Sequence, residues 1–273
     1  MPIRIASADD LPALRELFAR ANDAPYDLAA VAEEKCFGSG IAGAPVTRVF
    51  EENDRLLGAA VHCGKWLRVL AVDRDSRRRG IGTALLGTPD VIAAEPGNYF
   101  TPGVVTTDEG SLSFFRARGY VETRDTHNLL SPLPASRGES LGEGVRRPSH
   151  EDASRVLAFV EAEFGRIWRF EAAKAFERDI PPAFITEEHG AITGFAVHDV
   201  NNRGLGFFGP TGVAQPQRGR GLGCRLLLAS LADLHRLGYA HAVIPWTDAL
   251  AFYRKCCGAE PAHRFVALAK PQP

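Results

Sequence analysis

The sequence predicts a mixed α/β protein made of two tandem domains, each a mostly antiparallel sheet flanked by helices. One pattern, which reads as a strand end, a tight loop and an amphipathic helix, occurs twice, at residues 72–86 and 213–227. The two copies share Arg, Arg, Gly and Gly at matching places and keep a constant offset of 141 residues (213 − 72). A chain of 273 residues is long enough for two such domains.

Each copy also begins in the same way, with a short strand followed by a capped helix. Ser7 precedes Asp10 in an S-x-x-D pattern, which is typical of a helix start. The pattern recurs in Ser149 and Asp152, at an offset of 142 residues (149 − 7). The repeats predict an N-terminal domain, a linker rich in Pro, Ser and Gly, and a C-terminal domain, at residues 1–130, 131–144 and 145–273.

Composition indicates a globular protein and excludes several classes. The chain is 45% hydrophobic and 24% charged, with a net charge of −1, which argues against disorder and against a general nucleic-acid or membrane-surface binder. The first residues lack the apolar core of a signal peptide, and no apolar run approaches a membrane span. Five cysteines without a C-x-x-C pair predict reduced thiols, a cytoplasmic location and no metal site.

In the first half, the expected order is a strand, two helices, three antiparallel strands, a loop and a helix. These elements are, in chain order, strand 3–7, helices 11–18 and 28–37, and strands 46–51, 56–62 and 65–72. Asn53-Asp54 predicts a hairpin turn between two of the strands. Pro and Gly interrupt the segment after Leu86, so Tyr99-Phe100 is expected to be all of the fifth strand, before a helix at 111–118.

The second half repeats this order. Its expected elements are, in chain order, helices at 156–164 and 167–176, strands at 184–187 and 192–199, a central strand from Leu205, a long helix, a strand at 241–244 and a helix at 248–255. A turn at 188–190 separates the first two of these strands, and Gly238 is expected to end the long helix.

The loop at 218–223, Arg-Gly-Arg-Gly-Leu-Gly, predicts a site for a phosphate-bearing ligand. A helix start presents unpaired backbone N–H groups and a partial positive charge. The glycines remove Cβ atoms that would keep an anion away from those donors. Arg218 and Arg220 add positive charge in a fork geometry that suits phosphate. The matching residues of the first copy are Arg77, Arg79, Gly80 and Gly82.

Two other phosphate-binding loops do not match. No Gly-Lys-Ser/Thr occurs in the chain, and the sixth positions counted from Gly219 and Gly221 are Cys224 and Leu226, which break the dinucleotide fingerprint. The remaining pattern, R-x-x-G-x-G after a strand, resembles the phosphate loop of the GNAT family of acyl-CoA-dependent N-acetyltransferases. The resemblance covers nearly the whole chain in two copies, and it implies acetyl-CoA as the cosubstrate.

The resemblance also implies which residues contact acetyl-CoA. In that family a backbone N–H near the end of the central strand faces the thioester, and the loop holds the pyrophosphate. The set implied for the second copy is Thr211, Gly212, Val213, Arg218, Gly219, Arg220, Gly221, Leu222 and Gly223. The set implied for the first copy is Leu70, Val72, Arg77, Arg78, Arg79, Gly80, Ile81 and Gly82.

A tyrosine distinguishes the two halves. The family commonly places a tyrosine in a segment similar to F-Y-x-x-x-G-F, where it protonates the leaving thiolate; the second half has Phe252-Tyr253, but the first has Phe114-Phe115. Proton transfer from a tyrosine to a thiolate is uphill by only about 2 kcal/mol. Catalysis is therefore expected in the second half, with Tyr253 as general acid; the alternative is a tyrosine packed in the core. An extra residue before Gly258 predicts a bulge at this helix end.

The general base is assigned less directly. The resemblance places Asp248 at the strand end that faces the acceptor, although this residue could equally cap the next helix. Glu187, Glu188, His198, Asp199 and a bound water are the alternatives. The remaining histidines of the second half show no metal spacing and are interpreted as structural.

The implied activity is transfer of an acetyl group from acetyl-CoA to a primary amine of a small molecule, by direct attack on the thioester. A glucosamine-like acceptor is the first expectation, and an acetyltransferase acting on a peptide or protein amine is an alternative. A non-catalytic acyl-CoA-binding or sensing protein is the alternative from another class. The first half is expected to be degenerate, and to stabilise the fold, wall the acceptor cleft or hold acetyl-CoA without turnover, unless both halves act. No nucleic-acid or membrane partner is expected, and the sequence leaves the oligomeric state open.

Overall fold

The computed structural model describes residues 3–133 and 144–271, which form two compact units. Unit 1 comprises Met1–His127 and His263–Pro273, and unit 2 comprises Asn128–Ala262. Each unit combines a mostly antiparallel sheet with helices, which confirms the predicted fold class. Of the predicted linker, residues 134–143 lie outside the described residues, whereas Ser131 and Pro132 end a strand.

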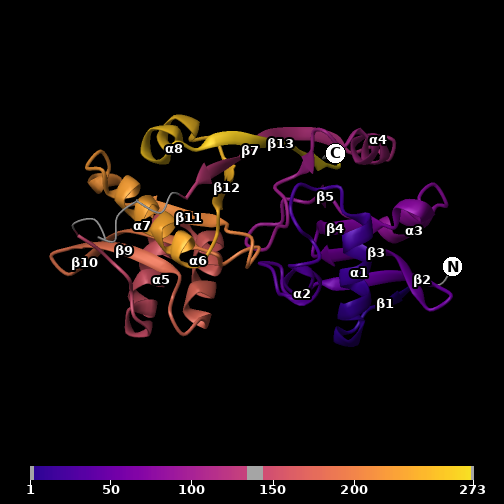
Figure 1. The fold of residues 1–273 in the computed structure, drawn as a ribbon, viewed down its shortest axis with the longest axis horizontal. Coiled ribbons are helices and arrows are strands. Elements are labelled where there is room, and N and C mark those ends of the chain that lie inside the picture. The colour runs from indigo at the N-terminus through magenta and orange to yellow at the C-terminus, as the bar shows by residue number, and fades with distance from the viewer. Residues whose placement is uncertain (1–2, 134–143, 272–273) are drawn as a thin grey trace. The chain divides into compact units, whose positions relative to one another are not determined.

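In the sheet of unit 1, the first strands lie side by side in chain order, and the last strand of the chain lies next to the fifth (Figure 1). Its elements are β1 (Ile3–Ile5), α1 (Leu11–Ala21), α2 (Ala32–Phe37), β2 (Val46–Glu52), β3 (Arg55–Cys63), β4 (Trp66–Val72), α3 (Ile81–Leu86), β5 (Val91–Ile92), β6 (Val104–Val105), α4 (Glu109–Arg116) and parts of β7 (Val121–Pro132) and β13 (Glu260–Ala269). The order is β1-β2-β3-β4-β5-β13, and β6 also pairs with β13. The pairs β1–β2, β2–β3 and β3–β4 are antiparallel, whereas β4 and β5 are parallel.

Local signals in the sequence placed several of these elements correctly. Asn53 and Asp54 both have left-handed backbone angles (φ 52° and 56°) in the turn between β2 and β3, which confirms the predicted hairpin. The capping box of Ser7 and Asp10 is present, and so is its repeat at Ser149 and Asp152. In both copies the capping aspartate also accepts hydrogen bonds from the arginine of the preceding strand.

The prediction for the fifth strand of the first half was wrong. β5 is Val91–Ile92, which pairs in parallel with Trp66 and Leu67, whereas Tyr99 and Phe100 lie outside any strand. The sequence pattern favoured the aromatic pair, but Pro96-Gly97 just before it is part of a turn. The register of β5 is fixed instead by its parallel neighbour.

A fully buried ion pair joins distant parts of unit 1. Arg68 Nε and Nη2 on β4 donate to the carboxylate of Glu95 at 2.5 and 2.9 Å, and both side chains are 0% exposed. Arg68 Nη1 also donates to the carbonyl oxygens of Lys35 and Gly38 at 2.7 and 2.8 Å. The pair therefore ties the central strand to the end of α2 and to the loop after β5.

We expect Glu95→Gln to lower the free energy of unfolding by about 2 kcal/mol. The amide would leave the Arg68 charge buried with an incomplete partner, although one oxygen could still accept. Urea unfolding followed by circular dichroism measures the change. Glu52→Gln is the matched control, because Glu52 pairs with Arg79 on the surface and should contribute less than about 0.5 kcal/mol. Equal changes in the two variants would contradict the structural role of the buried pair.

Unit 2 repeats the architecture. Its elements are β8 (Val145–Arg146), α5 (Ala153–Phe164), α6 (Arg166–Ala173), β9 (Ala183–Glu188), β10 (Ala191–His198), β11 (Phe208–Val213), α7 (Leu222–Arg236), β12 (His241–Thr247) and α8 (Leu250–Cys257). The antiparallel sheet has the order β11-β10-β9-β8, and β12 is the neighbour of β7. A parallel bridge between Phe207 and Val243 links the start of the central strand region to β12.

The two faces of this sheet carry separate cores. Phe195 and Val197 on β10 belong to the cluster formed by α5 and α6, whereas Ala196 between them belongs to the cluster formed by α7 and α8. This alternation follows from the two-residue period of a strand. The helices therefore cover both faces, with α7 and the loop before it on one side.

The helix α8 ends regularly, so the predicted bulge was wrong. The amide of Gly258 donates to the carbonyl of Arg254 at 3.0 Å, as in an ordinary last turn, and Gly258 takes the left-handed C-cap conformation (φ 71°). The residue added by Cys256-Cys257 is taken into the helix, because α8 continues beyond Tyr253 to Cys257. Tyr253 therefore keeps a normal helical position.

Two long strands are divided between the units. The end of β7, residues 128–132, belongs to unit 2, where β7 is the neighbour of β12. In β13, residues 263–269 belong to unit 1, where Leu268 and Ala269 pair with β5. Each unit thus completes its sheet with a strand that follows the last helix of the other copy. This pairing explains why residues 263–273 fall in unit 1, although the sequence placed them in the second domain.

Candidate functional site

The two Arg/Gly loops have the same local structure. Gly80 and Gly221 precede α3 and α7 with left-handed φ angles of 83° and 80°. Arg77 Nε donates to the carbonyl of Val72 at 3.2 Å, and Arg218 Nε donates to that of Val213 at 3.1 Å. The repeat seen in the sequence is therefore also a repeat of backbone geometry.

The last helix of each copy packs over its loop in the same way. A Cβ on Gly82 would lie 3.5 Å from the ring of Phe114, and a Cβ on Gly223 would lie 3.5 Å from the ring of Phe252. These positions correspond at offsets of 141 (223 − 82) and 138 (252 − 114). The next residues on these helices, Phe115 and Tyr253, therefore occupy equivalent places.

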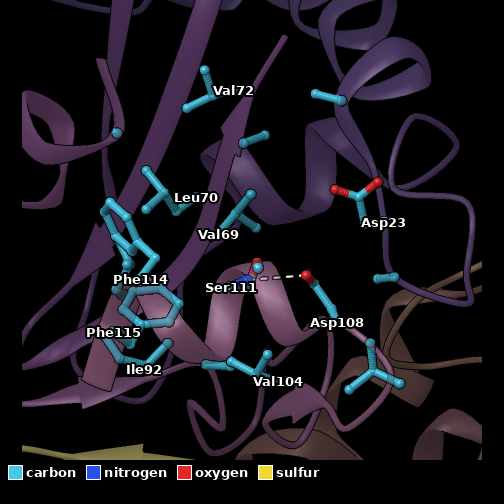
Figure 2. A pocket seen from close by; sticks show the side chains of 18 of the residues that line it. Asp23, Val69, Leu70, Val72, Ile92, Val104, Asp108, Ser111, Phe114 and Phe115 are labelled. Atoms are coloured by element: carbon cyan, nitrogen blue, oxygen red, sulfur yellow. Dashed lines mark hydrogen bonds between the residues drawn. The ribbon is translucent and has the colours of Figure 1, made fainter. Parts of the chain in front are cut away.

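A cavity of about 1040 Å³ opens beside the first loop (Figure 2). It lies where β4 runs past its parallel pairing with β5, so that Val69, Leu70 and Val72 line it. The side chains of Leu70, Phe114 and Phe115 lie on one side of it, and the carboxylates of Asp23 and Asp108 lie on the other (Figure 2). The cavity is thus apolar along the strand, and two carboxylates that are already paired or hydrogen-bonded lie opposite it.

The predicted first-copy set gathers at this cavity. The lining includes Leu70, Val72, Arg77, Arg78, Gly80, Ile81 and Gly82, that is, every residue of the set except Arg79. Space above the loop is open, because a Cβ on Gly80 would meet no atom within 4 Å. An elongated ligand with a phosphate end and an apolar end, such as an acyl-CoA, fits these residues.

Ion pairs occupy some of the predicted arginines. Both carboxylate oxygens of Glu52 accept from Arg79 at 2.9 Å, and Glu188 accepts from Arg220 at 3.0 and 3.1 Å. Arg77 pairs with Asp23 at 2.5 Å. Arg218 contacts only a backbone carbonyl, and Arg78 forms no hydrogen bond or ion pair with the part of the chain that the structure describes. Arg78 and Arg218, with the loop amides, are therefore the groups best placed to receive a phosphate.

An aromatic cluster borders the central strand of unit 2. A Cβ on Gly212 would lie 2.4 Å from the ring of Phe164, so this ring rests directly on the strand. Phe164 stacks on Trp168 at 5.1 Å and contacts Phe195 at 5.5 Å. Thr211 is held beside it by a hydrogen bond to the carbonyl of Phe195 at 3.0 Å. The predicted thioester end of this site therefore has an aromatic wall, made by the end of α5 and by α6.

Tyr253 points into the unit 2 core next to the loop. It is 8% exposed, and its ring contacts those of Phe252 and Phe208. Burial, with a smaller effect of the Cys257 thiol, raises the pKa of Tyr253 to about 12, although a hydrogen bond with Thr247 opposes the shift. The hydroxyl therefore stays protonated at neutral pH. Transfer of its proton to a thiolate is uphill by about 5 kcal/mol, unless the thiolate is buried equally.

The structure separates Asp248 from the alternative bases. Arg155 and Arg146 hold the pKa of Glu187 below its usual range, and Arg220 does the same for Glu188. His198 and Asp199 are 0% and 4% exposed. Asp248 is exposed after β12, and the N-cap of α8 is Ala249 without a side-chain capping bond. The N-cap position that the sequence left open for Asp248 is therefore occupied by Ala249.

His198 gives unit 2 a specific dependence on pH. Burial holds the pKa of His198 below its usual 6.5, although a hydrogen bond with Asp233 at 2.8 Å opposes the shift. The unfolded chain therefore binds more protons below pH 6.5 than the native state, so the free energy of unfolding falls as pH falls through this range. Burial alone would raise the pKa of Asp233, but hydrogen bonds from His198 and Arg147 hold it below its usual 3.8. Asp233 therefore changes the free energy of unfolding only below about pH 3.8.

We expect the urea midpoint to decrease between pH 7.5 and pH 5.0, and to decrease less in His198→Gln. His62→Gln is the matched control, because His62 in unit 1 also has a pKa lowered mainly by burial. Each variant alone should make the urea midpoint depend less on pH. An unchanged profile in His198→Gln would contradict a neutral, buried His198.

Several residues of the site were missed by the sequence interpretation. Val104 and Val105 line the cavity on the short strand β6, and Phe164 covers Gly212. The two β-branched residues after Pro102-Gly103 were a strand signal that could have been found. The position of Phe164 could not, because nothing local shows which strand a helix end covers.

Comparisons with known proteins agree with this geometry. Residues 151–259 match the model of the acetyltransferase (GNAT) family, a stretch that includes the second loop and Tyr253. No curated protein matches the chain. Within residues 3–133 and 144–271, no helix is long and apolar enough to cross a membrane. In the same residues, no group of three or more His, Cys, Asp or Glu side chains could hold a metal ion.

Three solved structures illustrate the fold. A glucosamine N-acetyltransferase region of a fungal multi-domain GH3 β-N-acetylglucosaminidase is 17% identical with a TM-score of 0.76, over 97% of this chain and 37% of that one. A GCN5-related N-acetyltransferase from Sphaerobacter thermophilus is 20% identical with a TM-score of 0.68, over 98% and 94%. A tandem GNAT protein from the clavulanic acid biosynthesis pathway is 19% identical with a TM-score of 0.66, over 99% of both chains. The fold of both units is thus that of tandem GNAT proteins.

Proposed function

From the GNAT acetyltransferase domain at residues 151–259, we propose that this chain transfers the acetyl group of acetyl-CoA to a primary amine of a small molecule, and that unit 2 carries the reaction. One observation supports this choice of unit. Tyr253 and Phe115 follow the equivalent residues Phe252 and Phe114, whose rings lie over the two loops, and only Tyr253 has a proton to give.

The residues of unit 2 account for each proton in the reaction. The amine loses a proton to Asp248 or to a water that Asp248 orients, and its nitrogen attacks the thioester carbonyl. Backbone N–H groups near Thr211–Val213 would stabilise the developing oxyanion, a contribution worth roughly 10²–10³ in rate. The C–S bond then breaks, and the Tyr253 hydroxyl protonates the leaving thiolate. The cost of this proton transfer falls if the leaving thiolate is buried as Tyr253 is, because burial then destabilises both anions. The proton taken from the amine passes through solvent to the Tyr253 anion, which restores both groups.

The proposed acceptor is an amino sugar such as glucosamine. Phe164 and Trp168 form a half-buried aromatic wall next to Gly212, and flat apolar rings pack well on the C–H face of a sugar. A related fold occurs in the fungal glucosamine N-acetyltransferase region. Asp248 at the adjacent strand end supplies a carboxylate for the amine.

An acceptor panel tests this function. Release of the CoA thiol from acetyl-CoA would be measured with glucosamine, an aminoglycoside, a polyamine, amino acids and a peptide with a free N-terminus. We expect glucosamine to raise release well above the hydrolysis background. Release with the peptide alone would favour a protein acetyltransferase. Binding of CoA with no release on any amine would favour the acyl-CoA-binding alternative.

For unit 1, the cavity supports a second function. It combines a phosphate loop, an apolar strand face and a volume of about 1040 Å³, but Phe115 replaces the tyrosine. We propose that unit 1 holds an acyl-CoA without turnover. Calorimetry of the full chain with CoA should then show two sites per chain. A single site in the unaltered chain, with no loss of binding when the first loop is altered, would contradict this role.

A further inference from the structure

The arginines that line the cavity of unit 1 differ in whether a carboxylate neutralises them. They are Arg68, Arg77, Arg78 and Arg118. The carboxylates of Glu95 and Asp23 pair with the first two. Within residues 3–133 and 144–271, the last two form no ion pair. The cavity therefore has two arginines whose charge no carboxylate of the described chain offsets.

Contacts on several sides hold the guanidinium of Arg118 beside the first loop. The side chain is half-buried, and its Cζ lies 3.6 Å from the centre of the Phe114 ring. Arg118 Nη1 donates to the carbonyl of Phe114 at 2.7 Å, and Nη2 donates to Thr83 Oγ1 at 2.5 Å. The Phe114 ring is also the one that a Cβ on Gly82 would approach to 3.5 Å. The charge is therefore fixed next to the first turn of α3.

These contacts leave donors for an anion. A guanidinium has five N–H groups, and Arg118 uses two of them, so three remain (5 − 2). The Phe114 ring covers a face of the guanidinium, whereas the N–H groups lie in its plane and point away from the ring. Because Thr83 Oγ1 accepts from Arg118, its own hydroxyl proton can serve a further acceptor. Arg118 and Thr83 are thus a preorganised set of donors.

The carboxylates that line the same cavity do not offset this charge. They are Asp23, Asp108 and Glu109. Arg77 neutralises Asp23, and the other two lie at the start of α4. Arg118 follows the end of that helix, and its eight residues span ~12 Å. An anion bound at Arg118 is therefore separated from both carboxylates by the length of α4.

The second copy lacks this pair of donors. Offsets of 141 and 138 place Thr83 on Cys224 and Arg118 on Cys256 (83 + 141 and 118 + 138). A thiol carries no positive charge and is only a weak hydrogen-bond donor. The two loops match in backbone geometry, but only unit 1 has a cation at this point beside its loop.

We propose that Arg118, together with Thr83, binds the 3′-phosphate of CoA in unit 1, so that this unit distinguishes CoA from 3′-dephospho-CoA. The inference rests on the proposed function of unit 1 as an acyl-CoA-binding unit. CoA carries a diphosphate and a separate 3′-phosphate on its ribose. Arg78 and the loop amides receive the diphosphate, which leaves the 3′-phosphate for the second arginine without a carboxylate. The planar fork of a guanidinium matches the oxygens of a phosphate.

Calorimetry of the full chain with CoA and with 3′-dephospho-CoA tests the assignment. In the wild type, we expect one of the two sites to bind 3′-dephospho-CoA roughly 10–100-fold more weakly than CoA, because charge-assisted hydrogen bonds are lost. In Arg118→Gln, this site should bind the two ligands with affinities within about twofold of each other. Arg118→Lys keeps the charge without the fork and should retain part of the preference. A purely structural role of Arg118 would weaken both ligands by the same factor and overturn the assignment.

Arg116→Gln is the matched control, because Arg116 lies on the same helix and pairs with Glu122 on the surface. This variant should keep the preference of the wild type for CoA. Two wild-type sites that each bind both ligands equally would overturn the 3′-phosphate assignment and leave the proposed function of unit 1 standing. A preference for CoA that survives in Arg118→Gln would also overturn it. A single CoA site that is unchanged by Gly80→Val would overturn both.

Discussion

Tyr253→Phe is expected to lower kcat by roughly 10²–10⁴-fold, while the Kd for acetyl-CoA stays within about twofold. The phenyl ring preserves the packing against Phe208 and Phe252 and removes only the proton donor. The leaving thiolate must then depart as an anion or take a proton from water. Steady-state kinetics with the best acceptor of the panel, together with calorimetry of acetyl-CoA, separate the two quantities.

Tyr239→Phe is the matched control for this experiment. Tyr239 lies in the same unit, and burial followed by the charge of Asp199 raises its pKa to about 12 as well. Its hydroxyl donates to Asp199 at 3.1 Å, and the ring contacts of Tyr253 do not involve this hydroxyl, so only the Asp199 bond is lost. We expect nearly unchanged turnover in this variant. Equal losses in both variants would mean that the Tyr253 effect is structural, and an unchanged rate in Tyr253→Phe would exclude it as the acid.

Replacing the loop glycines should remove the two CoA sites one at a time. Gly221→Val places a β-branched side chain at φ 80°, which forces the loop out of its left-handed conformation and misaligns the backbone donors. Loss of two charge-assisted hydrogen bonds weakens binding by about 3 kcal/mol, or roughly 10²-fold. Gly80→Val should do the same in unit 1. Calorimetry should show one remaining site in each single variant and none in the double variant.

Gly190→Val controls for backbone strain. Gly190 has a φ of 79° in the turn between β9 and β10, and a Cβ there would meet no atom within 4 Å, as at Gly221. This variant should therefore lose some stability and keep both CoA sites. Loss of a site in Gly190→Val would show that strain alone, rather than the loop donors, explains the result at Gly221. Retention of both sites in the double loop variant would contradict the phosphate assignment.

Local signals predicted the elements whose geometry depends on neighbouring residues. The turn at Asn53-Asp54 and the capping boxes at Ser7 and Ser149 require only nearby side chains, and both were placed correctly. The repeat at a constant offset predicted two equivalent loops, and the structure gives them matching angles at Gly80 and Gly221. The family match at 151–259 supports the resemblance on which the enzyme class depends.

Features that depend on long-range pairing could not be predicted in the same way. β5 is only Val91–Ile92, and its place is fixed by β4 rather than by its own sequence. The cavity lies in unit 1, beside the first loop, in the half that lacks the tyrosine. No local sequence pattern indicates the volume of this cavity. The pairing of Arg79 with Glu52 and of Arg220 with Glu188 was also missed, because each carboxylate comes from a distant hairpin.

The sharing of β7 and β13 between the units has a consequence for synthesis. Residues 263–269 complete the sheet of unit 1, yet they are translated after all of unit 2. Unit 1 cannot close its sheet while the ribosome is still making the second copy, so its β5 edge stays open for that time. Unit 2 therefore has all of its residues before unit 1 does, although the synthesis of unit 1 begins first.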